Sequence, residues 1–261
     1  MDKLEKLKKE IDNYLDKVLP KEKEIPEILH KAMRYSVFSG GKRLRPIIVL
    51  ITGEIFSVSK NKLLPVACGI ELIHNFSLIH DDLPAMDNDD FRRGKPTCHK
   101  KFGEDIAILA GDALLTLGFE LIAKSKNPEI LKEIAYSIGS YGMAGGQTLD
   151  ILYQNKKISE KLKKKIDEMK TGKLFEICFK VPLFFKKVHK KDKEILHRIS
   201  KNFGIAFQIR DDIEDKEGDV EKLKKKLKLL YRKLKKDVEH FGKKGTLLLE
   251  IIDKLYGKFG E

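Results

Sequence analysis

The sequence predicts an all-α protein, a single-domain bundle of about ten helices. Lys, Glu, Leu and Ile dominate the composition, Trp is absent, and only 19 Gly and 8 Pro occur in 261 residues, a balance that favours helix over sheet. Apolar residues recur mainly at helical spacing, and period-two alternation is scarce. We find no hairpin signal and no fixed-period repeat.

The individual helices follow from apolar spacing and from helix breakers. In the first helix the apolar residues are Leu4, Leu7, Ile11, Leu15 and Val18. Pro20 ends this helix, and a second begins near Pro26 and stops before Gly40-Gly41. The other predicted helices span roughly residues 46–57, 62–82, 104–125, 128–154, 159–180, 192–217, 219–241 and 246–258. Their long central segments are apolar enough to be buried on most sides.

Length and charge narrow the class of protein. With 261 residues and 41% hydrophobic residues the chain is long enough for one large core. The net charge of +13 alone suggests a nucleic acid or an anionic membrane as partner. However, residues 1–155 carry 22 basic and 22 acidic side chains, so the excess lies in Lys-rich stretches beyond them. Such a basic periphery suits a polyanionic substrate, although solvated lysine faces on helices explain most individual lysines equally well.

Cysteine usage and the N-terminal residues indicate a cytoplasmic protein. The three cysteines, Cys68, Cys98 and Cys178, are odd in number and widely spaced, so they form neither a disulfide framework nor a zinc motif. The first six residues are too charged for a secretory signal. The longest uncharged run, residues 134–149, contains four glycines, and we therefore expect no membrane span.

Two acidic clusters lie in otherwise apolar stretches, at residues 81–90 and 211–215. Carboxylates this close repel one another unless protons or cations neutralise them. Carboxylate oxygens shared with substrate phosphates are the usual ligands of Mg²⁺. The clusters therefore predict Mg²⁺ sites.

In the second cluster, Asp211 and Asp215 lie four residues apart, so both carboxylates project from one face of a helix, with Gln208 one turn earlier. The alternative, a solvated acidic turn, fits poorly because apolar residues precede the cluster directly. The spacing therefore favours metal binding.

In the first cluster, Asp81 and Asp87 lie six apart and do not align on an unbroken helix. Because Pro84 disfavours helix before it, we expect a small bulge that returns Asp87 to the face of Asp81. His74 lies two turns before Asp81 on that face. It is either a satisfied core residue or a charge-assisted donor to a phosphate.

Basic turns accompany the first cluster. Arg92-Arg93-Gly94 follows the acids directly, and Gly40-Gly41-Lys42-Arg43-Leu44-Arg45 forms a second basic turn without the spacing of a P-loop. Alone, each is more often ordinary surface. Together with two acidic clusters they imply two phosphate-bearing ligands, one bridged by Mg²⁺ and one held by Lys and Arg.

At these motifs the chain resembles the trans-isoprenyl diphosphate synthase (polyprenyl synthetase) family, and most closely its bacterial farnesyl diphosphate synthases. The matching segments run in family order: Gly40 to Pro46, His74, Asp81 to Asp87 with Arg92-Arg93-Gly94, Gly145-Gly146-Gln147 with Asp150, Lys170 to Lys173, and Phe207 to Asp215.

The resemblance implies the isoprenoid synthase fold around a deep central cavity, and a Mg²⁺-dependent prenyltransferase that condenses isopentenyl diphosphate with an allylic diphosphate. The implied metal ligands are Asp81, Asp82, Asp87, Asp211, Asp212 and Asp215. Arg92 and Lys173 are implied to assist on the allylic diphosphate. Gly41, Lys42, Arg45, His74 and Arg93 are implied to hold isopentenyl diphosphate, and Thr171 and Gln208 to line the allylic site. The family also implies a homodimer.

The same resemblance bears on product length. Phe76 lies five residues before Asp81, roughly 7–8 Å along a helix, and an aromatic ring there goes with short products in the family. Ser77 leaves room beside the ring. The two additional residues Pro84-Ala85 in the first aspartate-rich motif also go with short products in the family. We expect farnesyl diphosphate as the product, with geranylgeranyl diphosphate as the alternative. Phe76 as plain core packing is the competing interpretation.

The match fails after Asp215. Where family members usually carry a further diphosphate-binding lysine segment, residues 218–226 run directly into an amphipathic helix. We therefore describe residues 1–261 as one synthase domain with an atypical, shortened C-terminal helical region at 219–261. The altered end leaves a non-catalytic subunit of a prenyl synthase as an alternative, although such subunits commonly lose the metal aspartates. A terpene cyclase and a nucleic-acid-binding protein fit less well, because the second cluster is aspartate-rich and no nucleic-acid-binding module is found.

Overall fold

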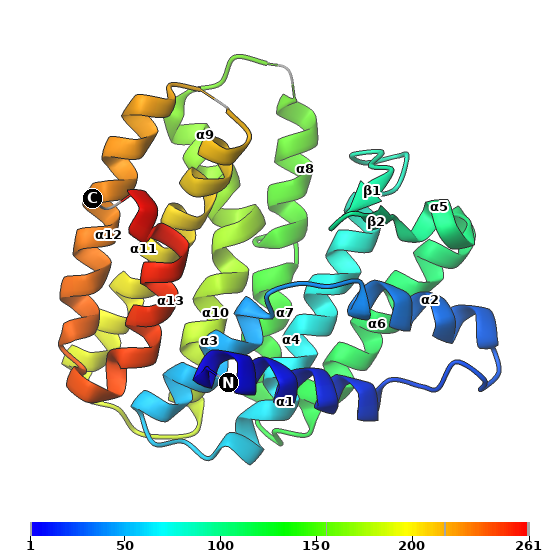
Figure 1. Ribbon diagram of the computed structural model, residues 1–261, viewed down its shortest axis with the longest axis horizontal. Helices are drawn as coiled ribbons and strands as arrows, with labels where there is room; N and C mark the ends of the chain where they lie inside the picture. Colours follow the sequence, from blue (N-terminus) through cyan, green and yellow to red (C-terminus); the bar gives the residue numbers. More distant parts are fainter. Residues whose placement is uncertain (1, 155, 217, 260–261) are drawn as a thin grey trace. The chain divides into compact units, whose positions relative to one another are not determined.

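The computed structural model describes residues 2–154, 156–216 and 218–259. Chain contacts divide it into two compact units. Unit 1 contains the residues up to Leu50 together with Asn61–Asn127, and unit 2 contains Ile51–Lys60 and the chain from Pro128 onward. Within the described residues, regular structure is helical apart from one short hairpin (Figure 1). The predicted all-α class is confirmed.

Unit 1 contains the N-terminal helices and the hairpin. Its elements are α1 (Lys3–Val18), α2 (Glu27–Phe38), the first part of α3 (Leu44–Ile55), α4 (Lys60–Asp81), β1 (Phe91–Arg92), β2 (Lys95–Pro96), α5 (Cys98–Phe102) and α6 (Glu104–Ala123). The side chain of Asp2 caps the first turn of α1 by accepting from the Leu4 N–H. Helices α2, α5 and α6 pack against one another.

Helix α4 is buried along most of its length, and α6 is apolar but more exposed. Both are long and apolar enough to cross a membrane by composition, with 61% of the most apolar window of α4 and 39% of that of α6 buried. A core helix of a globular protein passes the same test, so this is weak evidence for a span. The exposed side chains of Ile108 and Leu109 leave an apolar face on α6.

Unit 2 contains the remaining helices. These are α7 (Pro128–Ile138), α8 (Met143–Tyr153), α9 (Glu160–Asp167), a π-helix (Glu168–Gly172), α10 (Lys173–Lys180), α11 (Lys190–Glu214), α12 (Val220–Glu239) and α13 (Thr246–Tyr256). Short 3₁₀ turns span Val181–Phe184, Gly242–Gly245 and Gly257–Phe259. Helix α11 packs along α12 and α10, and α13 packs on α12.

An aromatic cluster fixes α11 in unit 2. The ring of Phe203 meets Phe175, Phe179 and Tyr256 edge-on, at centroid distances of 5.3, 5.5 and 5.7 Å. All four side chains are fully buried, and the Tyr256 hydroxyl donates to the Phe203 carbonyl at 3.2 Å. Burial of each ring contributes on the order of 2 kcal/mol. The cluster therefore anchors the helix that carries the second acidic segment.

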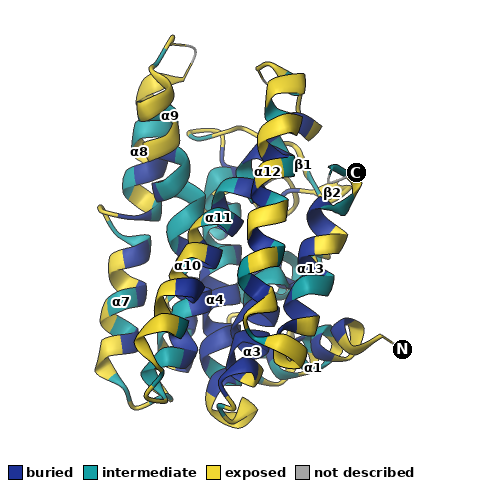
Figure 2. Cartoon of the chain, turned by 90° about the vertical axis from the view of Figure 1, so that its left-hand side faces the viewer, coloured by how far each residue is buried: buried dark blue, intermediate teal, exposed yellow. Residues whose placement is uncertain are grey.

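Helix α12 separates its apolar and basic residues as predicted. Its buried side chains, Leu227, Leu230, Leu234 and Val238, recur every three or four residues, and its lysines lie largely outside this stripe (Figure 2). The region after the second acidic cluster is thus packed helical structure.

The structure departs from the sequence prediction in several places. The predicted helix 128–154 is two helices, because residues 139–142 include two glycines, which are poor helix formers. The predicted helix 159–180 is interrupted by the π-helix. The end of the predicted helix 192–217 falls on Glu217, which lies outside the described residues. The hairpin, in which Phe91 pairs with Pro96 and Arg92 with Lys95, was not predicted.

Candidate active site

The first aspartate-rich segment begins at the carboxyl end of α4. The helix ends at Asp81, and the chain then turns back. The Asp87 N–H donates to the Asp81 carbonyl at 2.9 Å, and the Asn88 N–H donates to the Leu83 carbonyl at 3.1 Å. The predicted bulge within a helix is therefore wrong, because the helix stops before Pro84. The turn nevertheless returns the backbone of Asp87 to that of Asp81.

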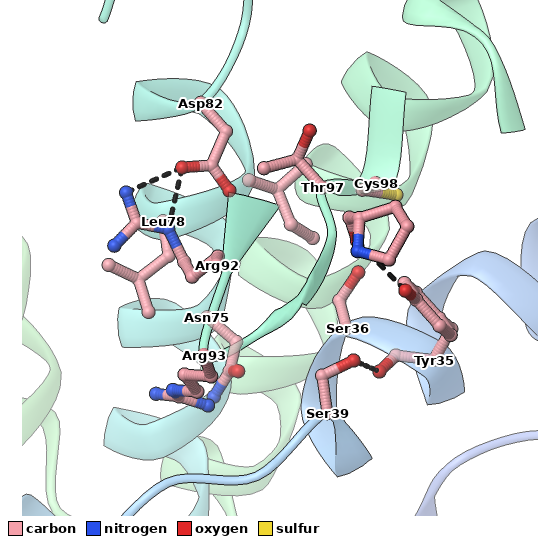
Figure 3. A pocket seen from close by; sticks show the side chains of 12 residues that line it. Tyr35, Ser36, Ser39, Asn75, Leu78, Asp82, Arg92, Arg93, Thr97 and Cys98 are labelled. Atoms are coloured by element: carbon pink, nitrogen blue, oxygen red, sulfur yellow. Dashed lines mark hydrogen bonds and ion pairs between the residues drawn. The ribbon is translucent and has the colours of Figure 1, made fainter. Parts of the chain in front are cut away.

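The hairpin sends its two arginines in different directions. Arg93 (φ 55°) and Gly94 (φ 74°) form its turn, with the two left-handed residues that a type I′ turn requires. Two-residue strands are too short to show alternation in a sequence, which is why the hairpin was missed. Figure 3 shows the side chain of Arg92 directed at Asp82 and that of Arg93 directed elsewhere.

Arg92 neutralises the buried carboxylate of Asp82. Its Nε and one terminal nitrogen lie 2.6 and 2.5 Å from the same Asp82 Oδ1, and it also reaches Asp89 Oδ2 at 3.2 Å. Asp82 is only 3% exposed. Burial raises the pKa of its carboxyl, and the Arg92 guanidinium opposes that shift. Part of the repulsion within the acidic segment is thus offset by a protein cation.

Arg93 docks on the glycine turn of the basic segment. One of its terminal nitrogens donates to the Gly40 carbonyl. Gly41 has φ 117°, and a Cβ added there would lie 2.8 Å from the Arg93 guanidinium carbon. Only glycine satisfies both the conformation and the close approach. Hence the turn at residues 40–41 and the hairpin are fitted to each other.

Arg45 and His74, both predicted to hold the same ligand, contact each other directly. An Arg45 terminal nitrogen lies 3.0 Å from His74 Nε2. Burial, and then the positive charge of Arg45 and Arg93, lower the pKa of His74 well below its ordinary value. His74 is therefore neutral here and accepts a hydrogen bond from Arg45 through Nε2. Lys42, in contrast, is exposed.

Arg43 has a structural position that the sequence analysis did not assign. Its side chain is 2% exposed and donates to Asp12 Oδ1 (2.7 Å), Glu71 Oε1 (3.1 Å) and the Val37 carbonyl (2.5 Å). The residue has φ 51°. Arg43 thus ties the basic turn to α1, α2 and α4.

A small cavity lies beneath the hairpin in unit 1 (Figure 3). It has a volume of about 30 Å³ and is lined by residues that include Asn75, Asp82, Arg92 and Arg93. That space accommodates a water molecule but not a diphosphate.

The second aspartate-rich segment lies at the end of α11 in unit 2. The Gln208 amide donates to Asp212 Oδ1 at 3.1 Å, and Lys163 Nζ lies 3.2 Å from Asp212 Oδ2. Arg210 donates to Asp211 Oδ1 at 2.6 and 3.2 Å. Asp215 caps the helix, and its N–H donates to the Asp211 carbonyl at 2.9 Å. Protein cations again accompany the carboxylates.

The π-helix positions Thr171 beside this segment. The Thr171 hydroxyl donates to the Gln208 amide oxygen at 3.3 Å, so Thr171, Gln208 and Asp212 form one hydrogen-bonded chain. A Cβ added to Gly146 on α8 would lie 2.3 Å from the Lys170 backbone nitrogen. The glycine of the Gly145-Gly146-Gln147 motif therefore permits the close contact between α8 and the π-helix.

Three ionisable groups lie near the π-helix. Lys173, the predicted diphosphate ligand, is paired with Glu176 at 3.1 Å. Lys170, which the sequence analysis did not assign a role, pairs with Asp150 at 2.6 Å. Burial, and next the charge of Asp212, raise the pKa of Asp167 to about 6. The spacing of these residues in the sequence did not predict their contacts, because the π-helix changes which residues share a face.

The chain is similar to known proteins over most of its length. The polyprenyl synthetase family model matches residues 26–229. The chain is 43% identical over 228 residues to the farnesyl diphosphate synthase of Bacillus subtilis, covering 84% of this chain and 77% of the relative. It is 40% identical over 225 residues to a geranylgeranyl diphosphate synthase of Cyanophora paradoxa, covering 83% and 74%. A geranyltransferase structure from Legionella pneumophila superimposes with a TM-score of 0.91 at 34% identity, covering 98% and 96%.

The chain belongs to the polyprenyl synthetase family. Its fold is that of the isoprenoid synthases, and the predicted family is confirmed. The family match ends at residue 229, within α12, so the last part of the C-terminal region lies outside it.

In this polyprenyl synthetase, some of the predicted site residues are neighbours within each unit. Gly41, Arg45, His74 and Arg93 are neighbours within unit 1, and Thr171, Gln208 and Asp212 are neighbours within unit 2. In the parts of the chain that the structure describes, no three His, Cys, Asp or Glu side chains form a preformed metal cluster. Three of the predicted metal ligands, Asp82, Asp211 and Asp212, are instead paired with arginine or lysine.

Phe76 and Ser77, the predicted chain-length residues, lie on α4. The Phe76 ring packs edge-on against His80 at 4.7 Å between centroids, and the Ser77 hydroxyl donates to the His74 carbonyl at 2.9 Å. His80 Nε2 in turn lies 3.1 Å from the Ile108 carbonyl oxygen. Phe76 is therefore supported on one side by a side chain that is itself held in place.

Proposed function

We propose that this chain is a Mg²⁺-dependent trans-prenyltransferase that joins isopentenyl diphosphate to dimethylallyl or geranyl diphosphate and makes farnesyl diphosphate. One observation carries the proposal. Neighbouring residues of one hairpin contact the two elements of the predicted site, since Arg92 binds the carboxylate of Asp82 and Arg93 binds the glycine turn at Gly40. An acidic segment and a basic turn thus adjoin, as two diphosphate ligands require.

The basic turn suits isopentenyl diphosphate. We assign that diphosphate to Gly41, Lys42, Arg45, His74 and Arg93. The exposed Lys42 supplies a point charge, and the forked guanidinium groups of Arg45 and Arg93 supply paired donors for phosphate oxygens. The neutral His74 orients Arg45 by accepting its hydrogen bond.

The carboxylate clusters suit Mg²⁺, because their donors are hard oxygens. Asp81, Asp82 and Asp87 from unit 1, and Asp211, Asp212 and Asp215 from unit 2, would hold it. When bound, Mg²⁺ supplies charge stabilisation for a pyrophosphate leaving group. Asp82 and Asp211 are paired with Arg92 and Arg210 in this structure. Mg²⁺ on these carboxylates would take over the neutralisation that the two arginines supply. We assign Arg92 and Lys173 to the allylic diphosphate.

In the proposed reaction the allylic C–O bond breaks and the pyrophosphate leaves with the electron pair. The double bond of isopentenyl diphosphate supplies the electrons of the new C–C bond, and loss of a proton restores the double bond. Arg92 stabilises the negative charge that develops on the leaving group. Thr171 and Gln208 place hydroxyl and amide oxygens beside the allylic carbon that becomes positive.

Product length is assigned to Phe76. Its ring is braced by His80, and we propose that it limits the depth available to the growing tail, with Ser77 leaving space beside it. Two further proposals concern the assembly and the location of the protein. The exposed apolar face of α6, including Ile108 and Leu109, supports a homodimer. The three free, buried cysteines fit a reducing cytoplasm.

We propose that residues 1–261 form one synthase domain whose shortened C-terminal region, 219–261, keeps activity. Lys222 and Lys224 are engaged with Glu160 (3.0 Å) and Glu221 (2.8 Å). If basic residues here replace the missing family lysine, neutralising the four lysines at 222, 224, 225 and 226 will raise the KM of the allylic substrate. Neutralising the three lysines at 233, 235 and 236 is the matched control. Equal effects would indicate general electrostatics and contradict the proposal.

The decisive test is incubation with isopentenyl diphosphate, Mg²⁺ and each allylic starter in turn, followed by sizing of the products. We expect farnesyl diphosphate from both dimethylallyl and geranyl diphosphate, and none when Mg²⁺ is chelated. A C20 product from farnesyl diphosphate would support the geranylgeranyl alternative. No product from any starter would support the non-catalytic subunit.

A further inference from the structure

A second cavity lies within unit 2, and none of the residues assigned above lines it. It has a volume of about 410 Å³, which is within the usual range for small-molecule sites. The end of α3, the loop before α11 and the turn between α12 and α13 form its walls. Its lining residues are Ile55, Phe56, Ser57, Lys186, Lys187, Val188, His189, Asp192, His240, Phe241 and Lys244.

One part of the cavity is apolar. Ile55 and Phe56 are buried, and the Phe56 ring meets Phe241 edge-on at 5.7 Å between centroids. Val188 extends this wall. A hydrocarbon or aromatic group placed here would leave water at a gain of roughly 25 cal/mol per Å² buried.

The rest of the cavity is strongly cationic. Lys186 and Lys187 are exposed, and neither has an ion-pair partner among residues 2–154, 156–216 and 218–259. The Lys244 ammonium group lies 3.4 Å from a neutral group, the Ser57 hydroxyl, and no carboxylate pairs with it in the described part of the chain. Three ammonium groups on one cavity, without carboxylates of their own, attract an anion with several oxygens.

The acid that lines the cavity is already engaged. Asp192 Oδ1 lies 2.7 Å from His240 Nε2, so its charge is directed at the imidazole. The neighbouring His189 begins α11 without making a side-chain capping bond. The lining of the cavity therefore combines a net positive charge with apolar side chains.

We propose that this cavity binds an organic phosphate, meaning a phosphate or diphosphate ester with an apolar group. Lys186, Lys187 and Lys244 hold the phosphate oxygens, and Phe56 and Phe241 cover the apolar group. The site does not depend on the function proposed above, since it shares no residue with it.

The probe is 4-fluorophenyl phosphate, followed by ligand-observed ¹⁹F NMR with the full chain and EDTA present. The main variant is Lys186→Ala/Lys187→Ala/Lys244→Ala. The matched control, Lys9→Ala/Lys17→Ala/Lys23→Ala, removes the same charge from exposed positions of unit 1. We expect the main variant to weaken binding at least tenfold and the control to change it less than twofold.

Two further measurements distinguish binding in this cavity from general attraction of an anion to a basic protein. Phe241→Leu should weaken the probe severalfold, and inorganic phosphate should displace it only at a concentration at least tenfold higher than unlabelled phenyl phosphate. Arg45→Ala should leave the affinity unchanged. Unchanged binding in the main variant, an equal loss in the control, loss on Arg45→Ala, or equal potency of inorganic phosphate would each overturn the proposal.

Discussion

Arg43 offers the sharpest test of how the basic turn is held. In Arg43→Met the side chain stays long but loses its charge, and any strain of the left-handed backbone is common to both proteins. The change removes the cationic partner of Glu71, which is 2% exposed. It also removes the hydrogen bonds to the Val37 carbonyl and to Asp12, which keeps Lys8 as a partner. Removing one partner of a buried ion pair costs about 3–5 kcal/mol, and we expect a loss in this range.

Urea unfolding followed by circular dichroism measures this loss. Lys31→Met, which breaks the exposed pair between Lys31 and Glu27, is the control and should cost less than about 0.5 kcal/mol. Adding Glu71→Leu to Arg43→Met should recover at least about 1 kcal/mol, because it removes the stranded charge. A loss below about 1 kcal/mol in Arg43→Met would refute the reasoning.

The same network predicts a pH dependence. Burial raises the pKa of Asp12, but the hydrogen bonds from Lys8 and Arg43 outweigh it, so the folded-state pKa is lowered. The stabilisation by Asp12 is therefore complete above the pKa that this group has in the unfolded chain. It is lost as pH falls through the lower pKa of the folded state. The stability gap between wild type and Arg43→Met should shrink below about pH 4.

Three predictions concern catalysis. Asp81→Ala and Asp211→Ala should each lower kcat by at least about a hundredfold while the helical circular dichroism spectrum is retained; near-normal turnover in either would contradict the metal assignment. Arg45→Ala should chiefly raise the KM for isopentenyl diphosphate and Arg92→Ala that for the allylic substrate, each by about tenfold or more, and a swapped pattern would show that the two sites are misassigned. Phe76→Ala should add at least one isoprene unit to the main product, with a stability loss of about 2–4 kcal/mol; an unchanged product from a folded, active variant would assign chain length to another residue.

Most of the fold could be predicted from sequence because its signals are local. The apolar spacing from Leu4 to Val18 and the break at Pro20 locate α1 almost to the residue. The errors arise where a local signal is weak or misleading. The run from 134 to 149 carries no charge, so nothing but its glycines marked the break at residues 139–142. The hairpin at Arg92 has strands too short to show a period.

The candidate site was predictable in its residue types more than in its contacts. Aspartate spacing located both acidic segments, since the charge repulsion within them is evident from sequence alone. It did not show that Asp82 is neutralised by Arg92, because that contact depends on the turn at Pro84. Nor did it show that Arg43 is a buried structural residue, which requires α1 and α4 to meet it.

The π-helix at Glu168–Gly172 has a consequence for how α9 and α10 are related. One residue more than an α-helical turn needs is accommodated there, so α9 and α10 keep the rotational phase that a regular helix one residue shorter would give them. If this segment became regular α-helix at its present length, α9 would rotate by about 100° relative to α10. Lys163 would then turn away from Asp212 without any helix being lost. The rotational register of the site therefore depends on the wide turn, and changes that convert it to regular helix should be more damaging than substitutions on the exposed face of α9.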